Sequence, residues 1–192
     1  MTTATEPPRN VYAALQGSAA RAPDRPAIVY QGETISYARL LAMVEVAALH
    51  LCARGLGTGR VFAAYSPNRP ELMLCYYAAA RLGAIFVPVN PNLTPSEVAY
   101  TCKHSGAELL LHDESVAAIA MQALPDGVLV PIEELCTPAP DIAPLPPADV
   151  APDDDFLIIY TSGTTGLPKA IVLDHEAQTR GPRALSEMWG LT

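Results

Sequence analysis

Five hydroxyl side chains, two glycines, a proline and a lysine stand between two apolar runs in the segment "IIYTSGTTGLPKAIVL", residues 158–173. Glycines let backbone N–H groups approach an anion closely, and Ser and Thr hydroxyls can donate hydrogen bonds to phosphate oxygens. The lysine adds a positive charge and is one of only two in the chain. These residue types predict a phosphate-binding loop. Its candidate ligands are Thr161, Ser162, Gly163, Thr164, Thr165, Gly166 and Lys169.

Two other interpretations of this segment remain open. Gly, Pro, Ser and Thr are also ordinary turn residues, so the segment could be a structural hairpin. A nucleotide-binding P-loop requires G-x-x-x-x-G-K-[ST] at the start of a helix. Here the glycines are three apart, Ala170 follows the lysine, and "IVL" predicts a strand. The P-loop is therefore the poorer alternative, and the residues alone leave a phosphate loop and a simple hairpin about equally favoured.

The elements that would position the loop alternate along the chain. Apolar residues at helical spacing follow Tyr37, with Ser36 placed to cap that helix. Short apolar runs at residues 61–66, 85–90, 108–112 and 156–160 predict buried strands. The strand at 156–160 ends where the hydroxyl-rich segment begins. The segment therefore lies at the carboxyl end of a strand, where open α/β sheets bind ligands.

Capping signals delimit two further helices. Asn68 is placed to cap a helix that contains Glu71 and stops at Gly83. Thr94 and Glu97 form a capping box around a proline, and that helix stops at Gly106.

Strands that alternate with helices, each strand a continuous apolar run, predict an α/β fold with parallel-sheet layers and flanking helices. We divide the chain into an α/β segment at residues 1–136, a linker rich in Pro and Asp at 137–154, and a final unit at 155–192. This last unit contains the strand, the loop and the helix that follows.

Composition narrows the classes of partner. Twelve basic against twenty acidic residues give a net charge of −8, so there is no basic field for nucleic acid or anionic lipid. The apolar runs are too short to span a bilayer, and we expect a cytoplasmic protein. The four cysteines show no Cys-x-x-Cys spacing, and we predict no metal site on this chain. We assign no chemistry to His50, His104 or His112.

The stretch "YTSGTTGLPKA", residues 160–170, closely resembles the phosphate-binding signature of the acyl-adenylating superfamily. This superfamily contains acyl-CoA synthetases, luciferases and the adenylation domains of peptide synthetases. The upstream stretches "ISYARLLAMV" and "YSPNRPELMLCYYAAARLGAIFVPVNPNLTPSEVAYTCKHSGAELLL" resemble its early strand and helix units in order and spacing. The resemblance covers nearly the whole chain and implies the amino-terminal part of the large domain of an adenylate-forming enzyme.

The resemblance implies a ligase that uses ATP and Mg²⁺ to activate a carboxylic acid as an acyl-adenylate. Pyrophosphate is released, and the acyl group usually passes to coenzyme A. The loop residues named above would close over the β- and γ-phosphates, and Lys169 would act in catalysis. "SGTTG" favours acyl-CoA ligases, since peptide-synthetase domains more often have serine at Thr164. The acyl substrate stays open.

The chain departs from the family pattern in two places. Ala170 stands where the family usually has glycine, and Gly181 and Pro182 are expected to interrupt the last helix, which Asp174 can cap. His175 matches a common family histidine, and we expect it to be structural.

The family's adenine and ribose sites, its magnesium-binding glutamate and its acyl pocket all match positions beyond residue 192. We therefore expect an amino-terminal segment that is inactive alone. The alternatives are a non-catalytic remnant, the partner-binding half of a split protein, or part of a peptide-synthetase-type adenylation domain.

Overall fold

The computed structural model describes residues 8–146, 148–161 and 168–189, and places a mixed sheet between two layers of helices. The sheet has the strand order β6-β5-β3-β4-β7-β8, and a separate hairpin pairs β1 with β2. All neighbours in the large sheet are parallel except β7 and β8. Its strands are β3 (Val61–Tyr65), β4 (Ile85–Val89), β5 (Leu110–His112), β6 (Leu129–Pro131), β7 (Asp155–Thr161) and β8 (Lys169–Asp174).

Helices cover both faces of this sheet, which confirms the predicted α/β class. One face carries α1 (Val11–Arg21), α2 (Tyr37–Ala53) and α3 (Pro70–Leu82), and the other carries α4 (Pro95–Ser105) and α5 (Ala117–Ala123). Strand β3 shows why both faces are apolar. Phe62 and Ala64 belong to the core beneath α2 and α3, whereas Ala63 and Tyr65 belong to the core beneath α4 and α5.

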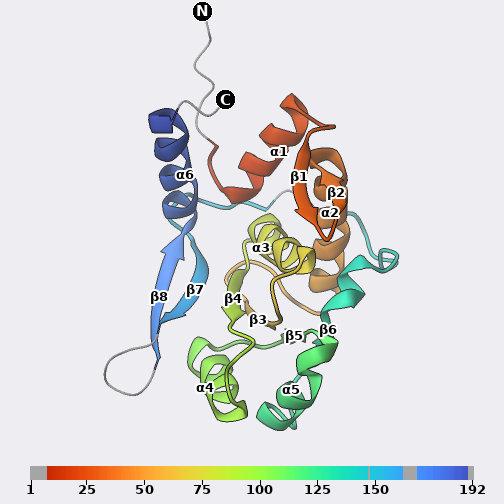
Figure 1. The fold of residues 1–192 in the computed structure, drawn as a ribbon, viewed down its shortest axis with the longest axis vertical. Helices are drawn as coiled ribbons and strands as arrows, with labels where there is room; N and C mark the ends of the chain where they lie inside the picture. Colours follow the sequence, from red (N-terminus) through yellow and green to blue (C-terminus); the bar gives the residue numbers. More distant parts are fainter. Residues whose placement is uncertain (1–7, 147, 162–167, 190–192) are drawn as a thin grey trace, which may run out of the picture.

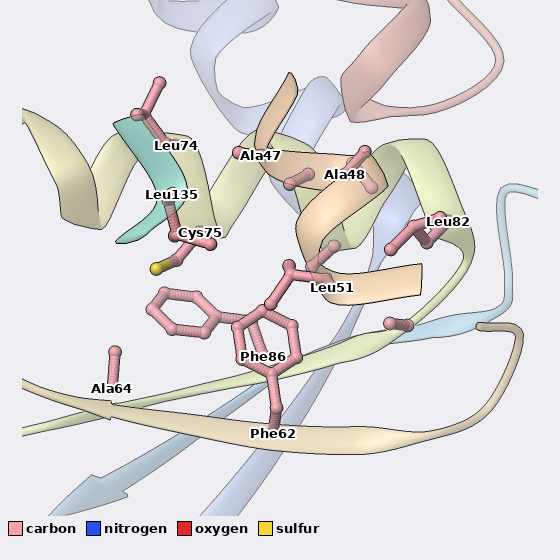
Figure 2. Close-up of a cluster of buried hydrophobic side chains, with 14 of the residues drawn as sticks. Ala47, Ala48, Leu51, Phe62, Ala64, Leu74, Cys75, Leu82, Phe86 and Leu135 are labelled. Atoms are coloured by element: carbon pink, nitrogen blue, oxygen red, sulfur yellow. The ribbon is translucent and has the colours of Figure 1, made fainter. Parts of the chain in front are cut away.

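The larger core lies between β3, β4 and the helices α2 and α3. Phe62 and Phe86 contact each other there with ring centroids 5.4 Å apart, and Leu51 and Cys75 pack above them (Figure 2). Alanines on α2 and α3 let the two helices approach closely, and Ala47 and Ala48 are fully buried. This packing holds β3 and β4 in place, and with them the ends of the strands from which the loops start.

Local capping signals gave mixed results. The box at Thr94 and Glu97 is present, and α4 ends at Gly106, as predicted. The cap of α3 was predicted at Asn68, and this was wrong, because Arg69 occupies that position. A residue before proline is restricted to extended conformations. Arg69 has φ −155° and ψ 162°, so it cannot be the first helical residue before Pro70.

The predictions missed three elements near the start of the chain, one helix and two strands. Helix α1 is capped by Asn10, whose Oδ1 accepts a hydrogen bond from the N–H of Ala13 at 2.8 Å. Strands β1 (Pro26–Tyr30) and β2 (Glu33–Ser36) form the small hairpin. Gln31 and Gly32 have φ of 51° and 84°, as a two-residue turn of type I′ requires.

Helix α6 (His175–Trp189) crosses Gly181 and Pro182 without ending there, so the expected interruption was wrong. A glycine before a proline lacks the Cβ that would clash with the ring, and the proline removes a single N–H from the helix. Asp174 caps α6 as predicted, since its Oδ1 accepts from the N–H of Ala177 at 2.7 Å. Among the described residues, no helix combines the length and the apolar composition that crossing a bilayer requires.

The described residues of the segment 137–154 contain neither helix nor strand. The segment is nevertheless tied to the core by Arg81, whose exposed fraction is 8%. Its guanidinium donates to the carbonyls of Leu145 and Pro146, both at 2.9 Å, and to the carboxylate of Glu45 at 3.0 Å. The segment leads from β6, at one edge of the sheet, to β7, near the other.

Candidate functional site

The parallel strands of the sheet end at a common level. Tyr65 pairs with Val89 on one side and with His112 on the other, and Phe86 pairs with Leu157. Strand β7 runs parallel to β4 and ends at Thr161, at the same end of the sheet. The loop therefore follows a strand at the carboxyl edge of the parallel part of the sheet, where the sequence led us to expect it.

Two of the predicted ligands lie at the base of this loop. Thr161 ends β7 and Lys169 begins β8, and the two residues are direct partners in the antiparallel pair. The Thr161 hydroxyl donates a long hydrogen bond of 3.5 Å to the carbonyl of Lys169. The other predicted ligands lie outside the described residues. These are Ser162, Gly163, Thr164, Thr165 and Gly166.

Lys169 is exposed and forms no ion pair with a described residue. A lysine ammonium carries three N–H donors, and outside an ion pair these are available to an anion. Thr161 is also exposed, and because its bond to the Lys169 carbonyl is long, its hydroxyl can rotate to donate to an anion instead. The base of the loop thus presents a cation and a hydroxyl side by side, the donor set that a phosphate group binds.

The residue before Thr161 contacts a helix. Tyr160 and His104 of α4 form a hydrogen bond of 2.8 Å between the phenol oxygen and Nδ1. Tyr100 stacks on the His104 ring with centroids 5.2 Å apart. Burial raises the pKa of the Tyr160 phenol above its ordinary value. We assigned no chemistry to His104 from the sequence, because nothing in the spacing signals a partner 56 residues away.

His175 is completely buried at the start of α6. Its ring stacks on Phe156 with centroids 4.4 Å apart, and its Nδ1 accepts a weak hydrogen bond from the N–H of Val11 at 3.4 Å. Burial holds its pKa below the ordinary 6.5, while Asp154 and Asp174 partly oppose this. Its Nε2 has no hydrogen-bond partner among the described residues. The imidazole lies at the opposite end of β8 from Lys169, so it does not join the loop.

A second polar centre on the same edge was not predicted. Arg69 follows β3 and donates to Glu71 at 2.7 Å, and it also pairs with Asp113 and Glu133. Hydrogen bonds from Ser115 and the nearby guanidinium lower the pKa of Asp113. A hollow of about 380 Å³ lies beside Arg69. Three carboxylates around one cation make this centre unsuitable for a phosphate, and β4 separates it from the loop.

The described residues fit the groups that the resemblance implies only in part. Thr161 and Lys169 have a hydroxyl and an ammonium, groups of the kind that hydrogen-bond to phosphate oxygens. Magnesium requires oxygen ligands, usually carboxylates. No group of three or more His, Cys, Asp or Glu side chains gathers in the described part of the chain in a way that could hold a metal ion. We therefore assign no Mg²⁺ ligand among the described residues.

Comparisons with known proteins identify relatives of the chain. The chain is 29% identical over 182 residues to a 3-hydroxybenzoate–CoA ligase of Aromatoleum sp. (strain CIB), covering 88% of this chain and 34% of that one. It is 33% identical over 153 residues to surfactin synthase subunit 3 of Bacillus subtilis (strain 168), covering 80% of this chain and 12% of that one.

A solved structure shows the same fold. It belongs to a putative long-chain-fatty-acid CoA ligase from Rhodopseudomonas palustris CGA009, with a TM-score of 0.85 and 26% identity. The match covers 95% of this chain and 49% of that one. The chain thus spans about a third of the length of the hydroxybenzoate ligase. It also matches the solved N-terminal domain of FACL13 from Mycobacterium tuberculosis with a TM-score of 0.78 and 30% identity, over 88% of this chain and 45% of that one. Because the AMP-binding enzyme family matches residues 15–190, the chain belongs to that family.

Proposed function

We propose that this chain supplies the phosphate-binding loop of an ATP-dependent acid–thiol ligase. The enzyme would activate a carboxylic acid as an acyl-adenylate, release pyrophosphate, and then form a thioester with coenzyme A. The observation that carries the proposal is the pairing of Thr161 with an exposed Lys169 at the carboxyl edge of the sheet, on either side of the segment 162–168.

In the proposed reaction, negative charge would develop on phosphate oxygens close to these donors. When the carboxylate attacks the α-phosphorus, negative charge grows on the departing pyrophosphate. A fixed ammonium and hydroxyls stabilise that charge more than the charge of bound ATP, so they raise turnover and not only affinity. Lys169 would contribute the cation, and Thr161 with the other predicted ligands would donate hydrogen bonds.

A second candidate is a peptide-synthetase-type adenylation domain, which the similarity to surfactin synthase subunit 3 supports. Both candidates share the adenylation step and differ in the thiol that accepts the acyl group. A third is a non-catalytic remnant or one half of a split protein. The mass of the native protein separates this third case, since the chain alone is 20.4 kDa and the hydroxybenzoate relative is about three times as long.

The test is Lys169→Ala in the native protein that carries this chain. Loss of one charge-assisted hydrogen bond is worth about 1.5 to 3 kcal/mol, which corresponds to about a ten- to a hundredfold fall in turnover. We expect pyrophosphate release at saturating ATP to fall by this factor, with little change in the KM for the acid.

The other lysine of the chain gives a matched control. Lys103 is exposed on α4 and is not one of the predicted ligands, so Lys103→Ala removes the same charge and leaves every predicted ligand in place. Its turnover should equal that of the unmodified protein. Equal turnover in the Lys169 variant would show that the segment is only a hairpin turn.

A further inference from the structure

An aromatic group joins the base of the loop to α4. Tyr160, the residue before Thr161, forms its hydrogen bond with His104 and packs edge-on against both His104 and Tyr100. Tyr100 and His104 lie one turn apart on α4 and stack on each other. Three aromatic rings, one from β7 and two from α4, thus contact one another beside the end of β7.

The hairpin has little other support at this end. Among the described residues, strand β8 pairs with β7 alone, and its residues from Lys169 to Val172 are exposed. Tyr160 pairs with Ala170, directly beside the pair of Thr161 with Lys169. The α4 helix lies next to this end of the hairpin (Figure 1). The hydrogen bond of Tyr160 with His104, together with the packing of Tyr160 against Tyr100, therefore links the loop base to a packed helix.

We propose that His104 and Tyr160 are positioning residues for the phosphate loop. This inference rests on the proposed function. When Nδ1 carries no proton, the Tyr160 hydroxyl donates to it, and the bond fixes the last residues of β7 relative to α4. Thr161 follows directly, and Lys169 is held opposite it by the strand pair. The pair of His104 and Tyr160 would thus set the separation and direction of the two phosphate donors without touching the phosphate.

The expected effect is modest, because His104 is exposed and Tyr160 only half-buried. Losing one hydrogen bond in such a setting changes a local equilibrium about two- to tenfold. Amide hydrogen exchange measures that equilibrium residue by residue. We therefore expect Tyr160→Phe and His104→Phe to speed exchange at Thr161 and at residues 169–171 by this factor, with exchange in β3 unchanged.

Two further variants make the test specific. His104→Asn keeps an acceptor near the position of Nδ1 and should restore slow exchange. Tyr100→Phe removes a phenol oxygen from the same aromatic group, and that oxygen has no hydrogen-bond partner among the described residues. It should leave exchange at the loop base unchanged. Equal acceleration in β3 and at the loop base, or no rescue by His104→Asn, would overturn the proposal in favour of a general packing role.

Binding of inorganic pyrophosphate to the full chain, followed by phosphorus NMR, separates this inference from the proposed function. If His104 and Tyr160 position the donors, Phe variants at either residue should weaken pyrophosphate binding about two- to tenfold, and His104→Asn should restore it. If the unmodified chain binds no pyrophosphate while the exchange results hold, the proposed function fails and the link to α4 stands. Unchanged exchange and unchanged binding in the Phe variants would refute the positioning role.

Discussion

The imidazole of His175 lies between Phe156 and the first turn of α1, closed off from solvent. Its position joins three elements that are distant in sequence, because α1, β7 and α6 all meet at this ring. Burial disfavours the charged ring, so the native state favours the neutral form. A residue that we expected to be structural thereby links stability to pH.

The sign of that linkage gives the first prediction. Above its ordinary pKa of about 6.5, the histidine is neutral in the folded and the unfolded chain. As the pH falls below this value, the unfolded chain gains a proton that the folded chain resists, so the free energy of unfolding decreases. His175→Phe keeps a ring to stack on Phe156 but cannot titrate. Denaturant unfolding measures the free energy of unfolding at about pH 7.5 and at about pH 5.5. This free energy should fall less between the two pH values in the variant than in the unmodified chain. An identical loss would assign the pH dependence to other groups.

At the scale of elements, two helices end in the same way but in different surroundings. Gly83 after α3 and Gly106 after α4 both adopt left-handed backbone, with φ of 67° and 73°. A Cβ on Gly83 would lie 3.2 Å from both Thr58 Oγ1 and Val150 Cγ2, whereas a Cβ on Gly106 would meet nothing within 4 Å. The two positions share a conformational requirement and differ in packing.

This difference predicts unequal costs for one substitution. Gly106→Ala should lower the free energy of unfolding by about 1 to 2 kcal/mol, the cost of a left-handed alanine. Gly83→Ala should lower it by more, since Val150 and Thr58 must also shift. Urea unfolding of the two variants measures both values. Equal losses would mean that the segment around Val150 yields freely and is not held against α3.

Elements whose signals are contained in a few residues could be predicted, and those set by distant contacts could not. The box at Thr94 and Glu97 lies within four residues, so its pattern was sufficient. The cap at Asn68 failed because the constraint from Pro70 acts on Arg69 and outweighs the side-chain preference of asparagine. The β1–β2 hairpin was missed because both strands are largely exposed, and because the apolar run of β1 is followed by the polar sequence ETIS in β2.

The same limit applied to the candidate site. The composition of the loop singled out Thr161 and Lys169, and strand pairing brings them together. The hydrogen bond between His104 and Tyr160 joins residues 56 positions apart in the sequence. The contacts of Arg69 with Asp113 and Glu133 span 44 and 64 positions, and its contact with Glu71 is local. Neither could be read from spacing, since only the sheet order decides which strand ends are neighbours.

At the scale of the whole molecule, the sheet ends in an open edge at β8. Ile171 and Val172 are 46% and 50% exposed, and the outer backbone groups of β8 have no neighbouring strand among the described residues. An apolar edge strand of this kind favours pairing with another chain. We expect the isolated chain to self-associate with increasing concentration and to bind a hydrophobic dye.

A charge on the edge should oppose this association. Val172→Lys adds a lysine, the residue that commonly protects edge strands, and should shift sedimentation towards the monomer. Met121→Lys is the control, because Met121 is 56% exposed but lies on helix α5. If both variants sediment alike, general charge and not the β8 edge governs association. A dye-free monomer at all concentrations would instead indicate a self-contained domain.

The length of the segment from β6 to β7 indicates where this part of the chain can accept insertions and deletions. The segment must cross four strand spacings, about 19 Å, yet its 18 residues, 137–154, could extend to about 60 Å. Arg81 holds the carbonyls of Leu145 and Pro146, so the register of β7 depends on that anchor and not on the residues before it. Insertions or deletions between residues 138 and 143 should therefore be neutral during evolution, whereas one beyond Pro146 would displace β7 and the phosphate donors with it.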